Sequence, residues 1–326
     1  MIYLETVIMP KLIKNSKQKS MPEKEYPERK SIIYSQNFLK SPELVHHLLE
    51  NTSINSNDIV YEIGPGKGII TEQLASRCQK VVAIEKDRKL SLRLKHRFSQ
   101  NPKIEIREGD FLKYKLPSFE YKVFSNIPFN ITADIIKKLI NTENSPSDTY
   151  LILQKEAAKK FNGFPYTDKE TLFSLLIKPW FKPEVIHNFR PNDFEPKPNI
   201  DTVLFRLEKR KKSLINNQEA QLYRDFITYV FNQWKPNAKE SLKKIFTNKQ
   251  LTKLAKNLDF NKSATVTQIK FDQWLGLFKY FLVGVEPAKK QFIIASTTRL
   301  EKQQKKLQKI HRTRTQTDWR RYIHKK

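Results

Sequence analysis

The tetrapeptide Asn126-Ile127-Pro128-Phe129 places an amide, a proline and an aromatic ring directly after a strand-like run at 121–125. An amide can exchange hydrogen bonds with the polar edge of a ligand, and an aromatic ring can stack on a flat heterocycle. Pro128 fixes its own φ and biases Ile127 away from helix, which holds the amide and the ring apart. In isolation this pattern is also typical of a plain turn. Within the order of motifs described below, it predicts a pocket for an extruded nucleobase.

Three of the seven glycines of the chain fall within Gly64-Pro65-Gly66-Lys67-Gly68. A buried-strand pattern at 58–63 precedes them and a helix pattern at 69–77 follows. A strand, a tight glycine turn and a helix N-terminus together predict a cradle for a nucleotide-sized ligand. The next predicted strand, 80–84, runs into Glu85, where a carboxylate can accept both ribose hydroxyls of an adenosine-containing cofactor.

The third predicted strand, 103–107, is followed by Gly109-Asp110-Phe111. At the carboxyl end of a parallel strand, Asp110 can accept from the amino group of a cofactor's adenine, and Phe111 can lie beside the ring. The spacing Glu-x-Gly-x-Gly-x-Gly at 62–68 differs from the dinucleotide pattern Gly-x-Gly-x-x-Gly. A hydride-transfer enzyme is therefore disfavoured.

The net charge of +27 indicates a polyanionic partner. Residues 209–326 hold 28 Lys and Arg against 8 Asp and Glu, so most of the excess lies in the last third of the chain. Nucleic acid is the favoured partner, with an anionic membrane surface as the alternative. We expect no membrane span because no apolar run approaches the roughly 20 residues that one needs. A single cysteine, Cys78, is typical of a reducing cytosol, so we expect a cytoplasmic protein.

The order of strand and helix patterns predicts an α/β protein with a mostly parallel sheet of seven strands. Beyond it, apolar and aromatic residues recur at helical spacing, which predicts the core of a small helical domain. We expect four parts: a flexible basic arm at 1–30, a Rossmann-like domain at 31–208, a helical RNA-binding domain at 209–282, and a basic C-terminal extension at 283–326 that folds on contact with RNA.

Several motifs occur in an order that resembles one known family. Gln36-Asn37-Phe38-Leu39, the 62–68 glycine loop and the 126–129 tetrapeptide are followed by a matching segment at 173–210. The chain is similar to the Erm family of 23S ribosomal RNA adenine-N6 methyltransferases over roughly residues 31–282. The resemblance implies a Rossmann-like methyltransferase sheet and S-adenosyl-L-methionine as the cofactor, with no metal.

The resemblance also implies a role for each matching position. Asn37 and Leu39 touch the methionine part of the cofactor, with Gly64 and Gly66 beneath it and Asn126 beside it. Glu85 binds the ribose, and Asp110 the adenine. The target adenine is held by Asn126 and Phe129, with a hydrogen bond from its N6 to the Asn126 side-chain oxygen or the Ile127 carbonyl. Related small-subunit enzymes usually carry Leu-Pro-Tyr where this chain has Ile127-Pro128-Phe129, so no tyrosine hydroxyl takes part.

The expected RNA contacts are basic residues after the catalytic motifs: Arg190, Lys197, Lys209, Arg210, Lys211 and Lys212. The resemblance implies 23S ribosomal RNA as the substrate, naked or in an assembling large subunit. Methylation there would confer macrolide, lincosamide and streptogramin B resistance. We expect a monomer. Two alternatives stay open at this point: a small-subunit ribosomal RNA adenine dimethyltransferase, and a non-enzymatic RNA-binding or ribosome-assembly factor.

Overall fold

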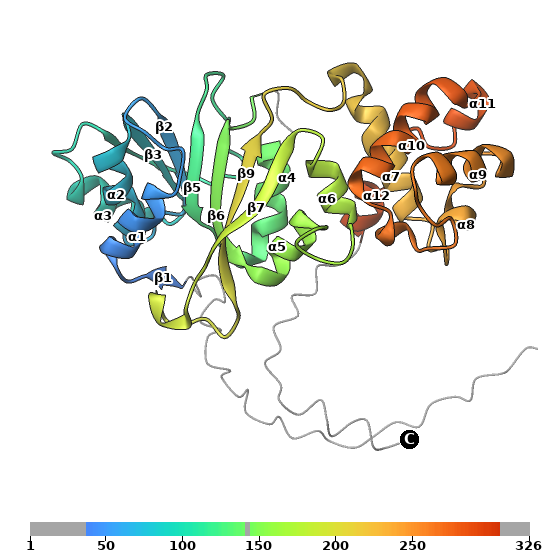
Figure 1. The fold of residues 1–326 in the computed structure, drawn as a ribbon. Helices are drawn as coiled ribbons and strands as arrows, with labels where there is room; N and C mark the ends of the chain where they lie inside the picture. Colours follow the sequence, from blue (N-terminus) through green and yellow to red (C-terminus); the bar gives the residue numbers. More distant parts are fainter. Residues whose placement is uncertain (1–36, 141–143, 307–326) are drawn as a thin grey trace, which may run out of the picture. The chain divides into compact units, whose positions relative to one another are not determined.

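A computed structural model describes residues 37–140 and 144–306 (Figure 1). The predicted arm at 1–30 and the last twenty residues of the predicted extension lie outside the described residues. No helix in the described ranges is long and apolar enough to cross a membrane.

A sheet of seven strands forms the centre of the catalytic region, in the spatial order β4-β3-β2-β5-β6-β9-β7. The first five strands in this order pair in parallel, whereas β9 pairs antiparallel with both β6 and β7. The predicted seven-stranded, mostly parallel sheet is confirmed. Its strands are β2 (Ile59–Ile63), β3 (Lys80–Glu85), β4 (Ile104–Glu108), β5 (Lys122–Asn126), β6 (Asp148–Gln154), β7 (Phe181–Asn188) and β9 (Thr202–Lys209).

The central strands are buried on both faces, which explains their nearly continuous apolar sequences. Side chains alternate along each strand, so Val60 joins one hydrophobic core while its neighbour Tyr61 joins the other. Helices α1 (Pro42–Glu50) and α2 (Ile69–Arg77) cover the first of these cores. Helices α4 (Thr132–Ile140), α5 (Lys155–Asn162) and α6 (Leu172–Ile177) cover the second (Figure 1).

Two helix starts form as their sequences predict. The Ser41 hydroxyl accepts from the Leu44 amide at 3.0 Å, and Pro42 takes the first helical position of α1. In α3 (Arg88–Arg97), the Asp87 side chain accepts from the Leu90 amide at 2.9 Å. These caps fix where α1 and α3 begin, and with them the connections that lead into the binding loops.

A second, two-stranded sheet was not predicted from the sequence. Strand β1 (Phe38–Leu39) pairs antiparallel with β8 (Phe194–Glu195), and the Lys40 amide donates to the Asp193 oxygen at 3.0 Å. The short helix η3 (Pro191–Asp193) precedes β8. This pairing joins the N-terminal segment to the proline-rich connector before β9.

The C-terminal helices enclose an aromatic core of their own. Phe226, Trp274, Phe278 and Phe281 are buried there, as expected for the apolar and aromatic residues that recur at helical spacing in this region. The Tyr223 hydroxyl donates to the Leu175 carbonyl at 2.9 Å, so α6 also packs against this core. The helices are α7 (Ala220–Phe231), α8 (Ala238–Leu242), α9 (Asn248–Asn257), α10 (Phe271–Gly284), α11 (Pro287–Lys290) and α12 (Ser296–Lys306), with short turns η2 (Phe129–Ile131), η4 (Asn217–Glu219) and η5 (Val266–Gln268) elsewhere in the chain.

The start of the C-terminal extension is folded, although we expected this segment to fold on contact with RNA. Val285 and Ile293 are buried in the helical core. The Asp225 carboxylate, 4% exposed, accepts from the Ala295 and Thr297 amides at 3.0 and 2.8 Å. Burial of apolar side chains and of two amide donors holds α12 against α7 in the free protein.

Candidate active site

Four chain segments that carry predicted site residues end at one edge of the sheet. Strands β4, β3, β2 and β5 are parallel neighbours, so their carboxyl ends lie side by side. Glu85 and Asn126 are the last residues of β3 and β5, whereas Gly64 and Asp110 follow β2 and β4 within two residues. In open parallel sheets this edge is where ligands bind.

The glycine loop adopts a backbone that only glycine accommodates easily. Gly64, Gly66 and Gly68 have φ values of 66°, 56° and 82°. A side-chain carbon on Gly66 would lie 2.3 Å from the Phe38 ring, and one on Gly68 would lie 2.8 Å from the Phe98 ring. The tight turn therefore brings the β1 segment directly over the loop and aims the start of α2 at the same edge of the sheet.

Glu85 connects the glycine loop to the end of β3. Its carboxylate accepts from the Gly66 amide at 3.3 Å and from the Asp87 amide at 2.9 Å. The side chain is 6% exposed, and this burial raises its pKa above the ordinary glutamate value. Its position beside the loop is the one that ribose recognition requires, and the ribose contact itself stays a prediction.

Asp110 retains the properties of a hydrogen-bond acceptor. Its carboxylate accepts from the Leu112 amide at 2.9 Å and from Lys86 Nζ at 2.9 Å, and the hydrogen bond from Lys86 lowers its pKa. Phe111, the next residue, is buried. Its ring is only 5% exposed and belongs to the core under the sheet, with Lys138 Nζ 5.5 Å from the ring centroid. Its place beside a cofactor's adenine stays a prediction.

The Asn126 side chain is oriented by the N-terminal segment. Its Nδ2 donates to the backbone oxygen of Asn37 at 2.6 Å, a bond between residues 89 positions apart. Among the described residues no donor is bonded to Asn126 Oδ1. The amide therefore presents its oxygen as a free acceptor at the carboxyl end of β5.

The rest of the tetrapeptide forms a turn around this amide. Ile127 is buried and its amide donates to the Ile152 oxygen at 3.4 Å, which extends the pairing of β5 with β6. Pro128 has φ −61° and ψ 122°, and Phe129 then begins the short helix η2. The Phe129 side chain is half-buried, so part of the ring remains available for stacking. This arrangement is compatible with the predicted base pocket.

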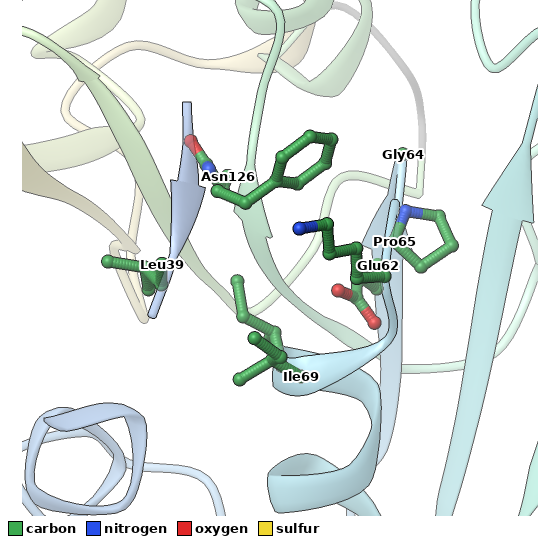
Figure 2. Close-up of a pocket in the computed structure, with 9 residues that line it drawn as sticks. Leu39, Glu62, Gly64, Pro65, Ile69 and Asn126 are labelled. Atoms are coloured by element: carbon green, nitrogen blue, oxygen red, sulfur yellow. The ribbon is translucent and has the colours of Figure 1, made fainter. Parts of the chain in front are cut away.

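A cavity at this site is lined by residues from β1, the glycine loop, the start of α2 and β5. Figure 2 shows the Asn126 amide beside the short strand that carries Leu39, with Glu62 and Ile69 facing the same space. The enclosed space is about 20 Å³, close to one water-sized space. This cavity is one part of the predicted site, because Glu85 and Asp110 lie outside its lining.

Several lining residues were not predicted as site residues: Phe38, Glu62, Pro65, Lys67, Ile69 and Ile70. Lys67 and Phe38 lie in the quoted motifs and have no side-chain chemistry that distinguishes them in the sequence. Glu62 had a usable signal, because an acidic residue in the middle of an apolar strand is unusual. The predicted residues Leu39, Gly64 and Asn126 do line the cavity. Glu85, Asp110 and Phe129 do not, although Glu85 contacts the loop that does.

Glu62 is a buried acid at the base of the glycine loop. It is 1% exposed, and its Oε2 accepts from the Thr71 hydroxyl at 2.6 Å. Burial raises the pKa of Glu62 to about 8, and the Thr71 hydrogen bond opposes this effect only in part. The carboxyl group is therefore mostly protonated at neutral pH, and a cationic ligand in the cavity would favour its ionised form.

The predicted RNA-binding residues fall into two groups. Arg190 and Lys197 are exposed on the connector that flanks β8. Lys209 is exposed at the end of β9, and Lys211 and Lys212 are exposed after it. Arg210 differs from these neighbours. Its side chain is half-buried and its Nε donates to the Lys178 carbonyl at 2.8 Å. Its guanidinium is fixed by the fold, which argues against a primary role in RNA contact.

Sequence comparison identifies the family of this fold and site. The model of the ribosomal RNA adenine dimethylase family matches residues 28–282. The chain belongs to this family. An rRNA adenine N-6-methyltransferase of Limosilactobacillus reuteri is 32% identical over 256 residues, which cover 78% of this chain and 97% of that protein. A ribosomal RNA small subunit methyltransferase A of Clostridium perfringens is 27% identical and matches 74% of this chain and 87% of its own length.

Solved structures share the fold. The 23S rRNA methyltransferase ErmE superposes with a TM-score of 0.69 at 24% identity, over 75% of this chain and 99% of that one. A dimethyladenosine transferase from Plasmodium falciparum superposes with a TM-score of 0.60 at 22% identity, over 76% of this chain and 98% of that one. Family membership makes the chain an S-adenosylmethionine-dependent rRNA adenine-N6 methyltransferase.

The residues at the sheet edge fit this cofactor. The positive φ values of the glycine loop let its backbone pass close to a ligand. The carboxylates of Glu85 and Asp110 lie at the ends of the adjacent strands β3 and β4, where they can accept from the polar groups of the cofactor. Glu62 and Glu85 also place two acidic groups around the loop, and a cofactor with a sulfonium and an ammonium group would favour the ionised form of both.

Proposed function

We propose that this protein methylates N6 of a specific adenine in 23S ribosomal RNA. The observation that carries this proposal is the hydrogen bond from Asn126 to the Asn37 backbone oxygen. It occupies the amide N–H₂ group and leaves Oδ1 as an acceptor, at the strand end next to the glycine loop. An acceptor at that point favours a ligand that carries an N–H donor, and the exocyclic amino group of adenine is such a donor.

The chemistry requires positioning more than activation. Adenine N6 is a poor nucleophile because its lone pair is delocalised into the ring, whereas the sulfonium of the cofactor, when bound, supplies a strong methyl donor. Accepting hydrogen bonds from N6 favours a geometry in which the lone pair turns out of the ring plane. Asn126 Oδ1 supplies one such acceptor, with the Ile127 carbonyl as a second, and holding the base in that geometry lowers the barrier.

Phe129 supports the same step from the face of the base. A half-buried ring can stack on an extruded adenine and stabilise the positive charge that develops as the methyl group is transferred. No dedicated general base is required, since N6 becomes acidic once it has gained the methyl group and solvent can take the proton. The roles of Asn126 and Phe129 are therefore separate and can be tested separately.

Two considerations support the large-subunit RNA as substrate. Relatives such as the Limosilactobacillus reuteri protein are named rRNA adenine N-6-methyltransferases rather than small-subunit methyltransferases, and the 23S enzyme ErmE shares the fold. The tetrapeptide also ends in Phe129 rather than the tyrosine usual in small-subunit enzymes. Methylation of the drug-binding loop would give resistance to macrolides, lincosamides and streptogramin B. We propose that the protein acts in the cytoplasm as a monomer.

The test is methyl transfer from radiolabelled S-adenosylmethionine to naked 23S RNA and to immature small subunits, followed by primer extension to map the modified nucleotide. Label in 23S RNA at one adenine is expected. Label only in the small subunit would assign the chain to the alternative dimethyltransferase class. Calorimetry with S-adenosylmethionine covers the third possibility, because absence of binding would leave a non-enzymatic assembly factor.

A further inference from the structure

Trp234 is held in an unusual position after helix α7. Its side chain is 92% exposed, and its backbone has φ 52°. It lies two residues beyond Asn232, the C-cap of α7. A left-handed backbone is usually found at glycine, because a bulky side chain there is strained. A large apolar side chain that is left in water also lacks the stabilisation that burial would give. Neither local structure nor core packing explains a tryptophan at this position.

The two chain neighbours of Trp234, Gln233 and Lys235, line a basic groove. It is formed by the end of α7 with the loop that follows, by α8, and by α12, and it has a volume of about 560 Å³. This is within the range of sites that accept nucleotide-sized ligands. Its charged lining residues are Lys235, Lys243, Lys244, Arg299 and Glu240.

The cations of the groove have different roles. Arg299 is fixed by the fold, since its guanidinium donates to the Ile294 and Phe292 carbonyls and to the Ser296 hydroxyl. Lys243 Nζ pairs with Glu240 at 2.7 Å. Lys235 and Lys244 are exposed and have no ion pair within the described residues. These two lysines are therefore the ones available to an incoming anion.

One wall of the groove comes from outside the range that the family model covers. Ser296, Arg299 and Gln303 belong to α12, whereas the family match ends at residue 282. Asp225 holds α12 in place by accepting from the Ala295 and Thr297 amides. The extension thus converts an open helical surface into a groove with amide, hydroxyl and cationic groups along its walls.

We propose that this groove binds a single-stranded segment of RNA, with a base stacked on Trp234 and phosphates at Lys235 and Lys244. The groove carries four cationic side chains and one anionic side chain. This excess of positive charge favours a polyanionic ligand such as RNA over a protein surface with a few acidic residues. The exposed indole favours an unpaired base, because a base inside a duplex has no free face to stack on. The proposal rests on the proposed function for the identity of the RNA, since the segment would flank the modified adenine.

The experiment measures binding of a short single-stranded RNA to the full chain by fluorescence anisotropy. Trp234→Gly should lower the affinity about ten-fold, the usual effect of removing one stacked base. Trp234→Phe keeps a ring and should retain most of the affinity. Lys235→Ala with Lys244→Ala should weaken binding and flatten its dependence on salt.

Stability measurements separate binding from a structural role. Glycine adopts φ 52° without strain, so Trp234→Gly should leave the melting temperature unchanged or raised while RNA affinity falls. A structural tryptophan would instead lower the melting temperature, and that result would overturn the proposal. Unchanged RNA affinity in Trp234→Gly would also overturn it, as would tighter binding of an RNA duplex or of an acidic peptide than of the single strand.

The failure of this proposal can be distinguished from that of the proposed function. If the wild type methylates 23S RNA but Trp234→Gly binds RNA normally, only the groove assignment is wrong. If the wild type binds the single strand through Trp234 but methylates no 23S RNA, the groove stands and the substrate assignment fails. Calorimetric affinity for S-adenosylmethionine should be equal in both proteins, which excludes damage to the cofactor site.

Discussion

The Asn126 side chain donates to the backbone oxygen of Asn37 at 2.6 Å, so the residue that presents an acceptor to the substrate is oriented by the segment ahead of the first helix. That segment is itself held from two directions. Phe38 and Leu39 pair with β8, and the Phe38 ring packs on Gly66 of the glycine loop. Residues 37–39 therefore contact both the glycine loop of the predicted cofactor site and the Asn126 amide of the predicted base pocket.

Replacing Asn126 tests this arrangement. Asn126→Ala should lower the rate of methyl transfer about 100-fold or more, because it removes the positioned acceptor for N6. Affinity for S-adenosylmethionine should stay near normal, since the glycine loop, Glu85 and Asp110 are untouched. Single-turnover methylation and calorimetry measure the two effects. Asn130→Ala is the matched control, because that amide is exposed four residues further on. Full activity in Asn126→Ala would refute the mechanism.

The buried Glu62 predicts a pH dependence of stability. Its folded-state pKa is about 8 against an ordinary value of 4.5, so the folded protein holds a proton that the unfolded chain releases between these values. The stabilising contribution is complete below pH 4.5 and is lost as the pH rises through about 8. Glu62→Gln removes this titration. Its unfolding free energy relative to wild type should rise from pH 5 to pH 8, by an amount on the order of a few kcal/mol.

Urea unfolding at several pH values, without cofactor, gives this difference directly. The sign is the critical result, because an exposed glutamate would give a difference that does not change with pH. Glu72→Gln serves as the control, since Glu72 is an acid on the exposed side of α2 whose side chain is 53% exposed. A flat difference for Glu62→Gln would mean that the carboxylate is ionised and solvated in the free protein.

A buried ion pair lies where the catalytic region meets the C-terminal helices. Lys178 Nζ lies 2.5 Å from Glu170 Oε1, with the side chains 9% and 1% exposed, and the Glu170 amide donates to the Thr267 oxygen at 2.7 Å. Glu170→Ala should lower the unfolding free energy by about 3–5 kcal/mol, because it leaves a buried ammonium without its partner. The double variant Glu170→Leu with Lys178→Met should recover most of this loss.

Exposed pairs provide the comparison. Lys243→Ala breaks the pair with Glu240, in which the side chains are 57% and 35% exposed, and should cost less than about 1 kcal/mol. Both sets are measured by urea unfolding at neutral pH. Equal losses for the buried and the exposed pair would contradict the assignment of Glu170 and Lys178 as a structural contact.

The docking of α12 depends on Asp225. Asp225→Ala removes the acceptor of two amides and should cost about 1–3 kcal/mol. Hydrogen exchange at residues 296–306 should become faster by a larger factor than exchange in α7. Glu301→Ala removes only the exposed contact of α12 with Lys137 and is the matched control. Equal exchange in both variants would show that apolar packing around Ile293 suffices to hold the helix.

The sequence could predict the parts of the site that follow from local pattern. Strand ends, the glycine turn and helix Ile69–Arg77 all depend on neighbouring residues. The structure places the helix as expected and the ends of the first four strands of the sheet within one residue of the predicted positions. The pairing of Phe38 with Glu195 could not be predicted in this way, because the two strands are two residues long and lie far apart in the chain. Such short strands have no periodicity to detect.

The same limit applies to single residues within a run of similar type. Lys209 to Lys212 form a uniform basic segment in the sequence, and only the packing of Arg210 against Lys178 separates it from its neighbours. Phe111 is similar, since an aromatic residue after a strand can face either a ligand or the core. Tertiary packing decides between these positions, and local sequence holds no signal for it.

This distinction leads to a test of the basic segment. Lys211 and Lys212 are exposed, so Lys211→Ala with Lys212→Ala should weaken RNA binding and reduce the slope of log affinity against log salt by about one to two, as expected for the loss of one or two phosphate contacts. Arg210→Ala should instead lower the melting temperature and leave the salt slope nearly unchanged, because its guanidinium donates to the Lys178 carbonyl. Filter binding between 50 and 200 mM salt, with thermal melts of each variant, measures both effects. If Arg210→Ala reduced the slope of log affinity against log salt more than the double lysine variant did, the prediction would be wrong, and Arg210 would be a phosphate contact.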